Sequence, residues 1–160
     1  MYKKLAMLLL GVWILSVMAY GDDDPLIGAW KLNLTKSKYN TSRPPSAQVN
    51  KYAPNGDNGV KVTIDSVDAD GKPGHNEISA TYDGKQYPVG TGTNAAGRKV
   101  AMSLKRTDAN TTVRTNYTDG KPLSTETRVV SKDGKTLTIT QTGVDEQGHN
   151  VDLVRVFDRQ

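Results

Sequence analysis

The sequence contains no cysteine and only one phenylalanine. Because it has no thiol, the chain cannot form a disulfide bond, a thiolate zinc site or a cysteine nucleophile. Its stability must come from an apolar core and from backbone hydrogen bonds, which a domain of this length can supply. Large apolar side chains are few, and threonine is abundant where strand interiors are usually aliphatic. This composition indicates a partly polar or hydrated interior.

Catalytic and metal-binding motifs are missing as well. The chain has no Gly-x-Ser-x-Gly motif and no phosphate-binding loop, and its two histidines, His75 and His149, both lie in Gly-His-Asn turns. A nucleophile–base pair is difficult to build from these residues, and a metal site requires three or four convergent ligands. The stretch Asp-Ala-Asp-Gly at 68–71 resembles the start of a calcium loop, but the later ligands are absent, so we interpret it as a turn. We expect no enzymatic activity, no metal and no cofactor.

Charged residues of both signs are scattered along the chain, without a block of lysine and arginine and without interleaved aromatic residues. A nucleic-acid-binding surface requires such a basic patch. We therefore expect no nucleic acid as a partner.

The one long apolar run lies in the N-terminal segment MYKKLAMLLLGVWILSVMAYG. Lys3 and Lys4 precede the apolar stretch 5–19, and small residues follow, which is the pattern of a secretory signal peptide. We expect cleavage after Ala19, or after Gly21, and export to the periplasm or the extracellular space. The alternative is an uncleaved membrane anchor, but at about 1.5 Å per residue the run is shorter than a bilayer core of about 30 Å.

The predicted organisation is thus a signal-peptide helix at 1–19 and one domain at 22–160, which we expect to be monomeric and without a membrane span. Cleavage removes two of the 21 basic residues and none of the 17 acidic ones, so the formal charge falls from +4 to +2.

The rest of the chain alternates apolar and polar residues with a period of two. Val60, Val62 and Ile64, for example, alternate with Lys61 and Thr63. This alternation is typical of strands with one buried face. We predict strands near 27–34, 47–53, 59–67, 76–82, 85–89, 99–106, 111–117, 122–131, 135–142 and 150–158.

Tight turns separate these strands. Asp-Gly-Lys occurs at 70–72, 83–85, 119–121 and 133–135, and Asp-Gly between alternating runs is a strong hairpin signal. Consecutive hairpins make an antiparallel meander, and closure into a barrel would remove its exposed edges. The predicted fold is all-β, a single up-and-down antiparallel barrel of about 8–10 strands. The proline-containing stretch 35–46 is the exception, and we expect it to form a long loop across one mouth.

The first strand carries Gly28-Ala29-Trp30. This Gly-x-Trp start resembles the lipocalins and fatty-acid-binding proteins, calycin families of small ligand-carrying barrels. The resemblance implies that Trp30 lies across the closed end of the barrel, packed on an arginine from a late strand, for which Arg155 and Arg159 are candidates. Gly28 and Trp30 are then a structural signature, Gly28 allowing close backbone approach beside the indole.

The last strand, LVRVFDRQ at 153–160, also resembles the end of intracellular fatty-acid-binding proteins, where an Arg-x-Tyr pair points inward and binds a carboxylate. The resemblance makes Arg155 and Phe157 the candidate ligand-binding residues. Two departures matter. Phe157 replaces the tyrosine and removes one donor, and the loop 35–46 is too short and too rich in proline for the paired lid helices of that family.

The whole chain after the signal further resembles a group of exported bacterial proteins of unassigned function, with Trp-Lys-Leu-Asn-Leu at 30–34 and VVSKDGKTLTITQTG at 129–143. That resemblance brings little functional information.

Both faces of the last strand are mixed, so the alternation does not decide whether Arg155 points inward. An inward Arg155 would be a buried cation and would require a partner. A bound carboxylate, Glu126, Asp83 or stacking on Trp30 could each provide it. The remaining alternative is a solvated arginine on the surface.

Two functions are consistent with these features. The first is a carrier that binds a small, partly apolar or amphipathic ligand inside the barrel, with Arg155 as its polar anchor, because larger barrels enclose cavities. The second is a structural or protein–protein interaction module of the bacterial envelope, whose barrel is filled.

Overall fold

The computed structural model describes residues 24–40 and 43–160. The predicted signal peptide and its cleavage site lie outside these residues. Within them, no helix has the length and apolar character required to cross a membrane.

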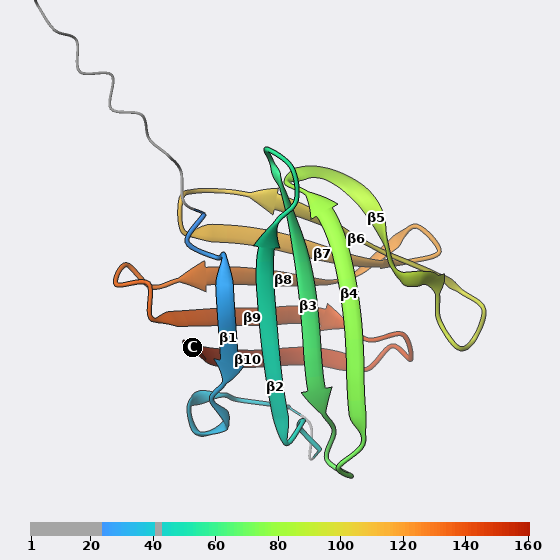
Figure 1. Ribbon diagram of the computed structural model, residues 1–160. Helices are drawn as coiled ribbons and strands as arrows, with labels where there is room; N and C mark the ends of the chain where they lie inside the picture. The colour runs from blue at the N-terminus through green and yellow to red at the C-terminus, as the bar shows by residue number, and fades with distance from the viewer. Residues whose placement is uncertain (1–23, 41–42) are drawn as a thin grey trace, which may run out of the picture.

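Ten antiparallel strands form one sheet in which neighbours along the chain pair, except β4 with β5, and the first strand pairs with the last (Figure 1). The up-and-down barrel prediction is confirmed. The strands are β1 (Gly28–Leu32), β2 (Ala47–Pro54), β3 (Gly59–Val67), β4 (Pro73–Thr81), β5 (Asp83–Thr93), β6 (Lys99–Arg106), β7 (Thr111–Thr118), β8 (Lys121–Val130), β9 (Thr136–Val144) and β10 (Asn150–Arg159). A short 3-10 helix, η1 (Leu34–Lys36), follows β1.

Apolar and polar residues that alternate in the sequence point alternately to the inside and the outside of the barrel. In β3, Val60 and Val62 are buried and Lys61 between them is exposed. At the turn from β7 to β8, Asp119 and Gly120 have φ values of 50° and 75°. A two-residue hairpin of type I′ requires positive φ at both positions, so this Asp-Gly pair forms the tight turn expected of it.

The barrel is not completely closed, because β4 and β5 are the two ends of the sheet and do not pair. The prediction of a hairpin turn at 83–85 is therefore wrong. Residues 83–85 belong to β5, where the register against β6 shifts between Asp83 and Gln86, so Asp-Gly-Lys forms a bulge here. Pro73 in β4 and Pro88 in β5 lack a backbone N–H, and strands at the edge of a sheet tolerate this loss.

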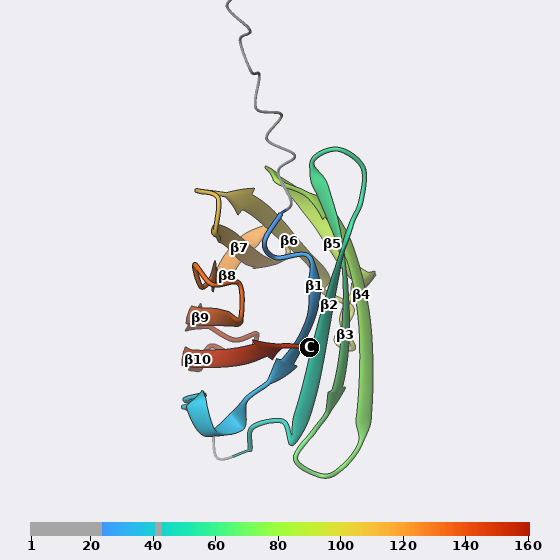
Figure 2. The ribbon, with the colours of Figure 1, turned by 60° about the vertical axis from the view of Figure 1, so that its left-hand side comes forward.

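The sheet curves into two facing layers, β1–β5 and β6–β10 (Figure 2). Because the strands alternate in direction, the connections divide between two ends. The base carries residues 24–27, the turns at 55–58, 107–110 and 131–135, and the end of β10. The mouth carries the β1–β2 loop and the turns at 68–72, 94–98, 119–120 and 145–149.

The described parts of the loop 35–46 lie at the mouth end. Lys38 and Val154 exchange backbone hydrogen bonds of 2.7 and 2.8 Å, which hold this loop along β10. Arg43 forms an ion pair with Asp70 in the turn between β3 and β4. The loop therefore joins two separate parts of the mouth.

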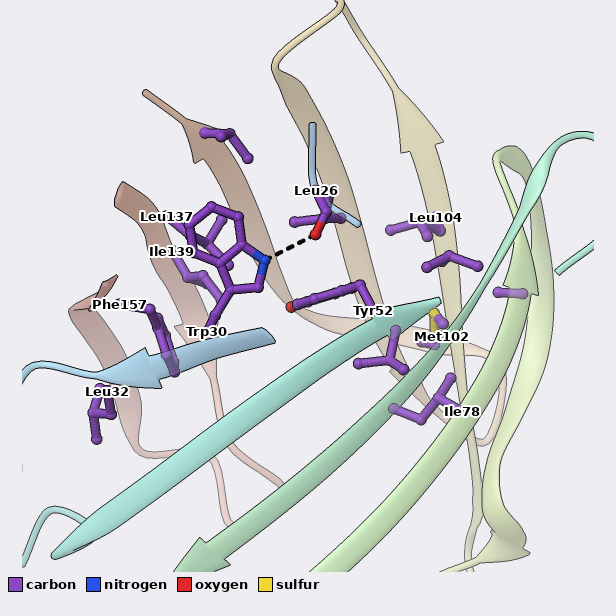
Figure 3. Packing of buried hydrophobic residues seen from close by; sticks show 14 residues of the cluster. Leu26, Trp30, Leu32, Tyr52, Ile78, Met102, Leu104, Leu137, Ile139 and Phe157 are labelled. Atoms are coloured by element: carbon purple, nitrogen blue, oxygen red, sulfur yellow. Dashed lines mark hydrogen bonds between the residues drawn. The ribbon is translucent and has the colours of Figure 1, made fainter. Parts of the chain in front are cut away.

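Trp30 seals the base of the core. Its side chain is fully buried and packs near Leu137, Ile139 and Phe157 (Figure 3). The indole Nε1 donates a 2.8 Å hydrogen bond to the carbonyl of Leu26. Trp30 thus lies at the end of the barrel where the Gly-x-Trp start predicts it.

The arginine that covers the indole is Arg159, whose guanidinium carbon lies 4.1 Å from the ring centroid. Arg159 also donates to the carbonyls of Pro25, Ile27 and Gly134 at 2.6, 2.9 and 2.5 Å. Gly28 makes room for it: φ is 132° there, and a Cβ would lie 2.6 Å from Nη1 of Arg159. Trp30 provides the ring of a cation–π contact at the base, and Gly28 leaves the space that Arg159 needs to make it.

We predict that Trp30→Ala lowers the free energy of unfolding by about 3–5 kcal/mol, because it empties a fully buried site that the rigid wall cannot refill. Chemical denaturation followed by circular dichroism measures this, since the substitution removes the fluorescent side chain itself. Leu34→Ala is the control: Leu34 is 41% exposed and should cost little. A loss below about 1 kcal/mol for Trp30→Ala would show that the indole is not a core plug.

Candidate functional site

Charged side chains line the middle of the barrel on its inner face. The register of the sheet places Arg114 of β7 opposite Glu126 of β8, and places Arg128 of β8 and Arg155 of β10 on either side of Ile139 of β9. Since residues two apart on a strand share a face, Glu126 and Arg128 both point inward. Three strands thus deliver three guanidinium groups to the surroundings of one carboxylate.

Glu126 is the centre of this cluster. Arg128 Nη2 forms a buried ion pair with its Oε2, and Arg155 Nη2 lies 3.5 Å from its Oε1. The Asn116 amide donates to the same Oε1 at 3.4 Å. Glu126 and Arg128 are each only 6% exposed, so these charges interact with little screening by solvent.

Neutral polar side chains of β7, β8 and β9 form hydrogen bonds with one another and with the cluster. Ser124 Oγ accepts hydrogen bonds of 3.1 Å from the amides of Asn116 and Gln141. Gln141 Oε1 in turn accepts a 3.1 Å bond from Arg155 Nη2. Arg155 is therefore oriented by both Glu126 and Gln141.

The electrostatics of the cluster are asymmetric. Burial by itself raises the pKa of Glu126, but the attraction of Arg128, Arg114 and Arg155 outweighs it and lowers the pKa to about 2. Burial lowers the pKa of Arg114, and repulsion from Arg128 and Arg155 adds to this against the attraction of Glu126. The carboxylate is strongly stabilised as an anion, whereas Arg114 is a cation in an unfavourable environment.

Several guanidinium donors are left without a partner. Among the described residues, Nε of Arg114, Nε and Nη1 of Arg128 and Nε of Arg155 are buried and make no hydrogen bond. The Tyr39 hydroxyl is also buried and makes no hydrogen bond. Its pKa is raised overall, because the effect of burial exceeds the opposing effect of Arg155. Buried donors are nearly always paired in native proteins, so these atoms mark a place where an acceptor fits.

Two cavities meet at Arg114. One, of about 40 Å³, lies among the cluster and the apolar side chains that face it. The other, of about 330 Å³, lies toward the mouth. Its inner end is polar, with Arg114, Asn116 and Gln141. Toward the mouth it is lined by the apolar Leu123, Val144 and Val151 and also by two carboxylates, Asp145 and Glu146, which pair with His149 and Arg98. A negatively charged group would therefore find cations at the inner end, beside an apolar stretch of wall.

A larger cavity of about 640 Å³ lies at the base, outside the plug. Its charged groups already satisfy one another: Arg106 Nη2 is 2.5 Å from Asp24 Oδ2, which also accepts a 2.7 Å bond from the Tyr82 hydroxyl, and Arg106 lies over the Tyr82 ring at 4.4 Å. Because these groups pair with each other, the base is a less suitable binding site than the interior.

The structure decides the orientation of the last strand. Arg155 points inward and pairs with Glu126, one of the partners that the sequence suggested, while Asp83 lies at the base, paired with Lys85. Phe157 is fully buried but belongs to the core around Trp30, away from the cavities that contact the arginines. Arg155 and Phe157 therefore share a face but lie in different environments.

The two histidines are separate. His75 pairs with Asp65 at 2.7 Å and His149 with Asp145 at 3.0 Å, both on the exterior. Within residues 24–40 and 43–160, no group of three histidine, aspartate or glutamate side chains could hold a metal ion. Asp68 accepts backbone hydrogen bonds from Asp70 and Lys72, as expected for a turn.

Sequence reasoning missed Arg114 and Arg128. On β8 the outward residues are Thr125 and Thr127 and the inward ones are Glu126 and Arg128, which reverses the usual placement of charge on the wet face. In the sequence, Thr125 and Thr127 alternate with Glu126 and Arg128. This alternation of uncharged and charged residues is the signal that could have revealed the reversal.

No family model matches the chain, and no curated protein matches it either. Solved structures do. The fluorescent protein UnaG is similar with a TM-score of 0.57 and 17% identity over 84% of this chain and 96% of that one. A Schistosoma mansoni fatty acid binding protein in complex with arachidonic acid is similar with a TM-score of 0.60 and 16% identity, over 88% and 99%. The fold is similar to that of these two proteins. At this identity the likeness concerns the fold alone.

We predict that Glu126→Gln destabilises the protein by about 3–5 kcal/mol near neutral pH, because it leaves three buried arginines without a counter-charge. The folded-state pKa lies below the usual value of 4.5, so the contribution of the carboxylate is complete above that pH and is lost as the pH falls toward 2. The difference between wild type and variant should therefore narrow between about pH 4.5 and pH 2.

Urea denaturation across this pH range measures the effect. Glu77→Gln is the matched control, because Glu77 forms an exposed pair with Lys61 and such pairs contribute little. Equal stability losses in the two variants would contradict the assignment of Glu126 as the counter-charge of the interior.

Proposed function

We propose that the protein is exported and that its barrel binds a small, partly apolar molecule with a negatively charged head group. One observation carries the proposal: three inward guanidinium groups share a single carboxylate and keep unpaired buried N–H donors. An anion at this point would supply the missing acceptors through charge-assisted hydrogen bonds. The predicted signal peptide is the reason for proposing export.

The shape of the interior agrees with an amphipathic ligand. Its head group would lie at Arg114, where the two cavities meet, and its apolar part would occupy the cavity of about 330 Å³ toward the mouth. That volume falls at the lower end of the range usual for small-molecule sites. A barrel of this fold holds arachidonic acid in the Schistosoma mansoni protein, which shows that the architecture accommodates an acid with an apolar chain.

The proposed role is binding and not catalysis. The polar groups at the site are arginines, amides, the hydroxyls of Ser124 and Tyr39, and a carboxylate that the arginines hold in its charged form. Both histidines pair with carboxylates on the exterior. A nucleophile activated by a neighbouring base is not part of this arrangement.

The unpaired edges of β4 and β5 and the small central cavity of about 40 Å³ favour a second candidate, an interaction module whose barrel is filled. An edge strand can accept a partner strand. Native mass spectrometry of protein purified from its own host separates the two functions. A co-purified small molecule supports the carrier, whereas a bare barrel that captures an envelope protein supports the module.

We predict that decanoate displaces a fluorescent fatty acid from the barrel more strongly than decanol does. Arg114→Gln should weaken decanoate binding about 10- to 100-fold, the usual value of a hydrogen bond to a charged group, and leave decanol binding unchanged. Arg155→Gln should have a smaller effect, because Nη2 of Arg155 is already engaged by Glu126 and Gln141.

Lys105→Gln, a charge removal on the exposed outer face of β6, is the control and should leave both ligands unaffected. No displacement by any acid would refute the carrier function. Equal losses of decanoate and decanol binding in Arg114→Gln would show that this side chain supports the fold and does not bind the head group.

A further inference from the structure

The interior of the barrel carries two net positive charges. Arg114, Arg128 and Arg155 face Glu126 as their one carboxylate. The other inward arginine of this region, Arg106, is neutralised by Asp24 at the base. Among the described residues that line the central cavity, the remaining polar side chains are Gln48, Asn50 and Tyr52, which add no charge at neutral pH. The cavity toward the mouth adds two carboxylates, Asp145 and Glu146, which pair with His149 and Arg98. The excess positive charge therefore belongs to the inner end of the site, around the three arginines.

A singly charged head group leaves one of these charges uncompensated. Buried charges without a counter-charge are costly, so a carboxylate relieves only part of the cost. The free donors also come from three strands, since Arg114 belongs to β7, Arg128 to β8 and Arg155 to β10. One oxygen pair cannot serve donors that converge from three directions, whereas a group with more acceptor oxygens can.

From this charge count and the convergence of unpaired N–H groups we infer that the site selects a doubly charged head group, a phosphomonoester or a dicarboxylate, over a singly charged one. This inference rests on the proposed function, because it concerns the same interior site. Arginine matches such groups well, since its planar fork of donors binds phosphate and carboxylate oxygens in pairs. Two negative charges would make the buried cluster neutral as a whole.

The cluster keeps its charge over the pH range in which a phosphomonoester changes charge. Glu126, with its pKa near 2, stays ionised, and the guanidinium group of arginine is not deprotonated in proteins. Burial raises the pKa of Tyr39, so its hydroxyl stays neutral in that range. An alkyl phosphate, in contrast, acquires its second charge near pH 6. A change in its affinity between pH 5 and pH 8 therefore reports the charge of the ligand.

The test compares decyl phosphate, decyl sulfate and decylmalonate by isothermal titration calorimetry with the wild-type protein at pH 5 and pH 8. Decyl sulfate is the matched control, because its tetrahedral head group carries one charge at both pH values. It also reports any contribution from His149, which lies in a mouth turn. We expect decyl phosphate to bind at least about tenfold tighter than decyl sulfate at pH 8, and this advantage to shrink at pH 5.

The comparison of the two doubly charged ligands shows which kind of head group the site prefers. Tighter binding of decyl phosphate than of decylmalonate assigns a phosphomonoester, and the reverse order assigns a dicarboxylate. Equal affinities for decyl sulfate and both dianions at pH 8 would overturn the inference while leaving the proposed function intact. If none of decyl phosphate, decyl sulfate, decylmalonate and decanoate binds, both the inference and the proposed function are overturned.

Arg114→Gln gives an independent check, because it reduces the net interior charge to one positive unit. The preference for decyl phosphate over decyl sulfate at pH 8 should then fall to about threefold or less, with circular dichroism confirming that the variant is folded. An undiminished preference in the folded variant would contradict the charge count. The wild-type comparison decides the inference even if this variant does not fold.

Discussion

The attraction between the Glu126 carboxylate and three inward guanidinium groups organises the interior of this barrel. Without Glu126, the arginines that β7, β8 and β10 bring together would repel one another in a region that water hardly enters. With it, the cluster is held together, and the amides of Asn116 and Gln141 fix its orientation. The compensation is incomplete, because one carboxylate faces three cations. That deficit leaves buried N–H groups of the three arginines without acceptors.

The arginines of this protein divide by how fully their donors are satisfied. Arg159 donates to three carbonyls and covers the Trp30 ring, and Arg106 pairs with Asp24, so both belong to the structure of the base. Arg114, Arg128 and Arg155 retain buried N–H groups without acceptors. Arginine therefore occupies two different environments in this barrel, and they differ in the number of acceptors within reach of its donors.

Much of the fold follows from local patterns. Alternation placed all ten strands near their observed ranges, because this signal depends only on neighbours in the chain, whereas the position of Trp30 at the base was implied by the resemblance of Gly28-Ala29-Trp30 to calycin barrels. The seam between β4 and β5 did not follow, since Asp-Gly at 83–84 is compatible with a turn or with a bulge and the choice depends on how β5 pairs with β6. For the site, Arg155 and its partner Glu126 were among the suggested residues, whereas Arg114 and Arg128 were not.

The sequence by itself determined the strands, most of the turns and the presence of charged residues within alternating runs. Only the tertiary structure decided which set of alternating residues faces inward, and hence that charges line the cavity while threonines face outward on β8. The physical reason is that a period of two divides a strand into two faces without saying which is concave. The curvature of the whole sheet makes that choice, and it alone brings arginines from β7, β8 and β10 around one carboxylate.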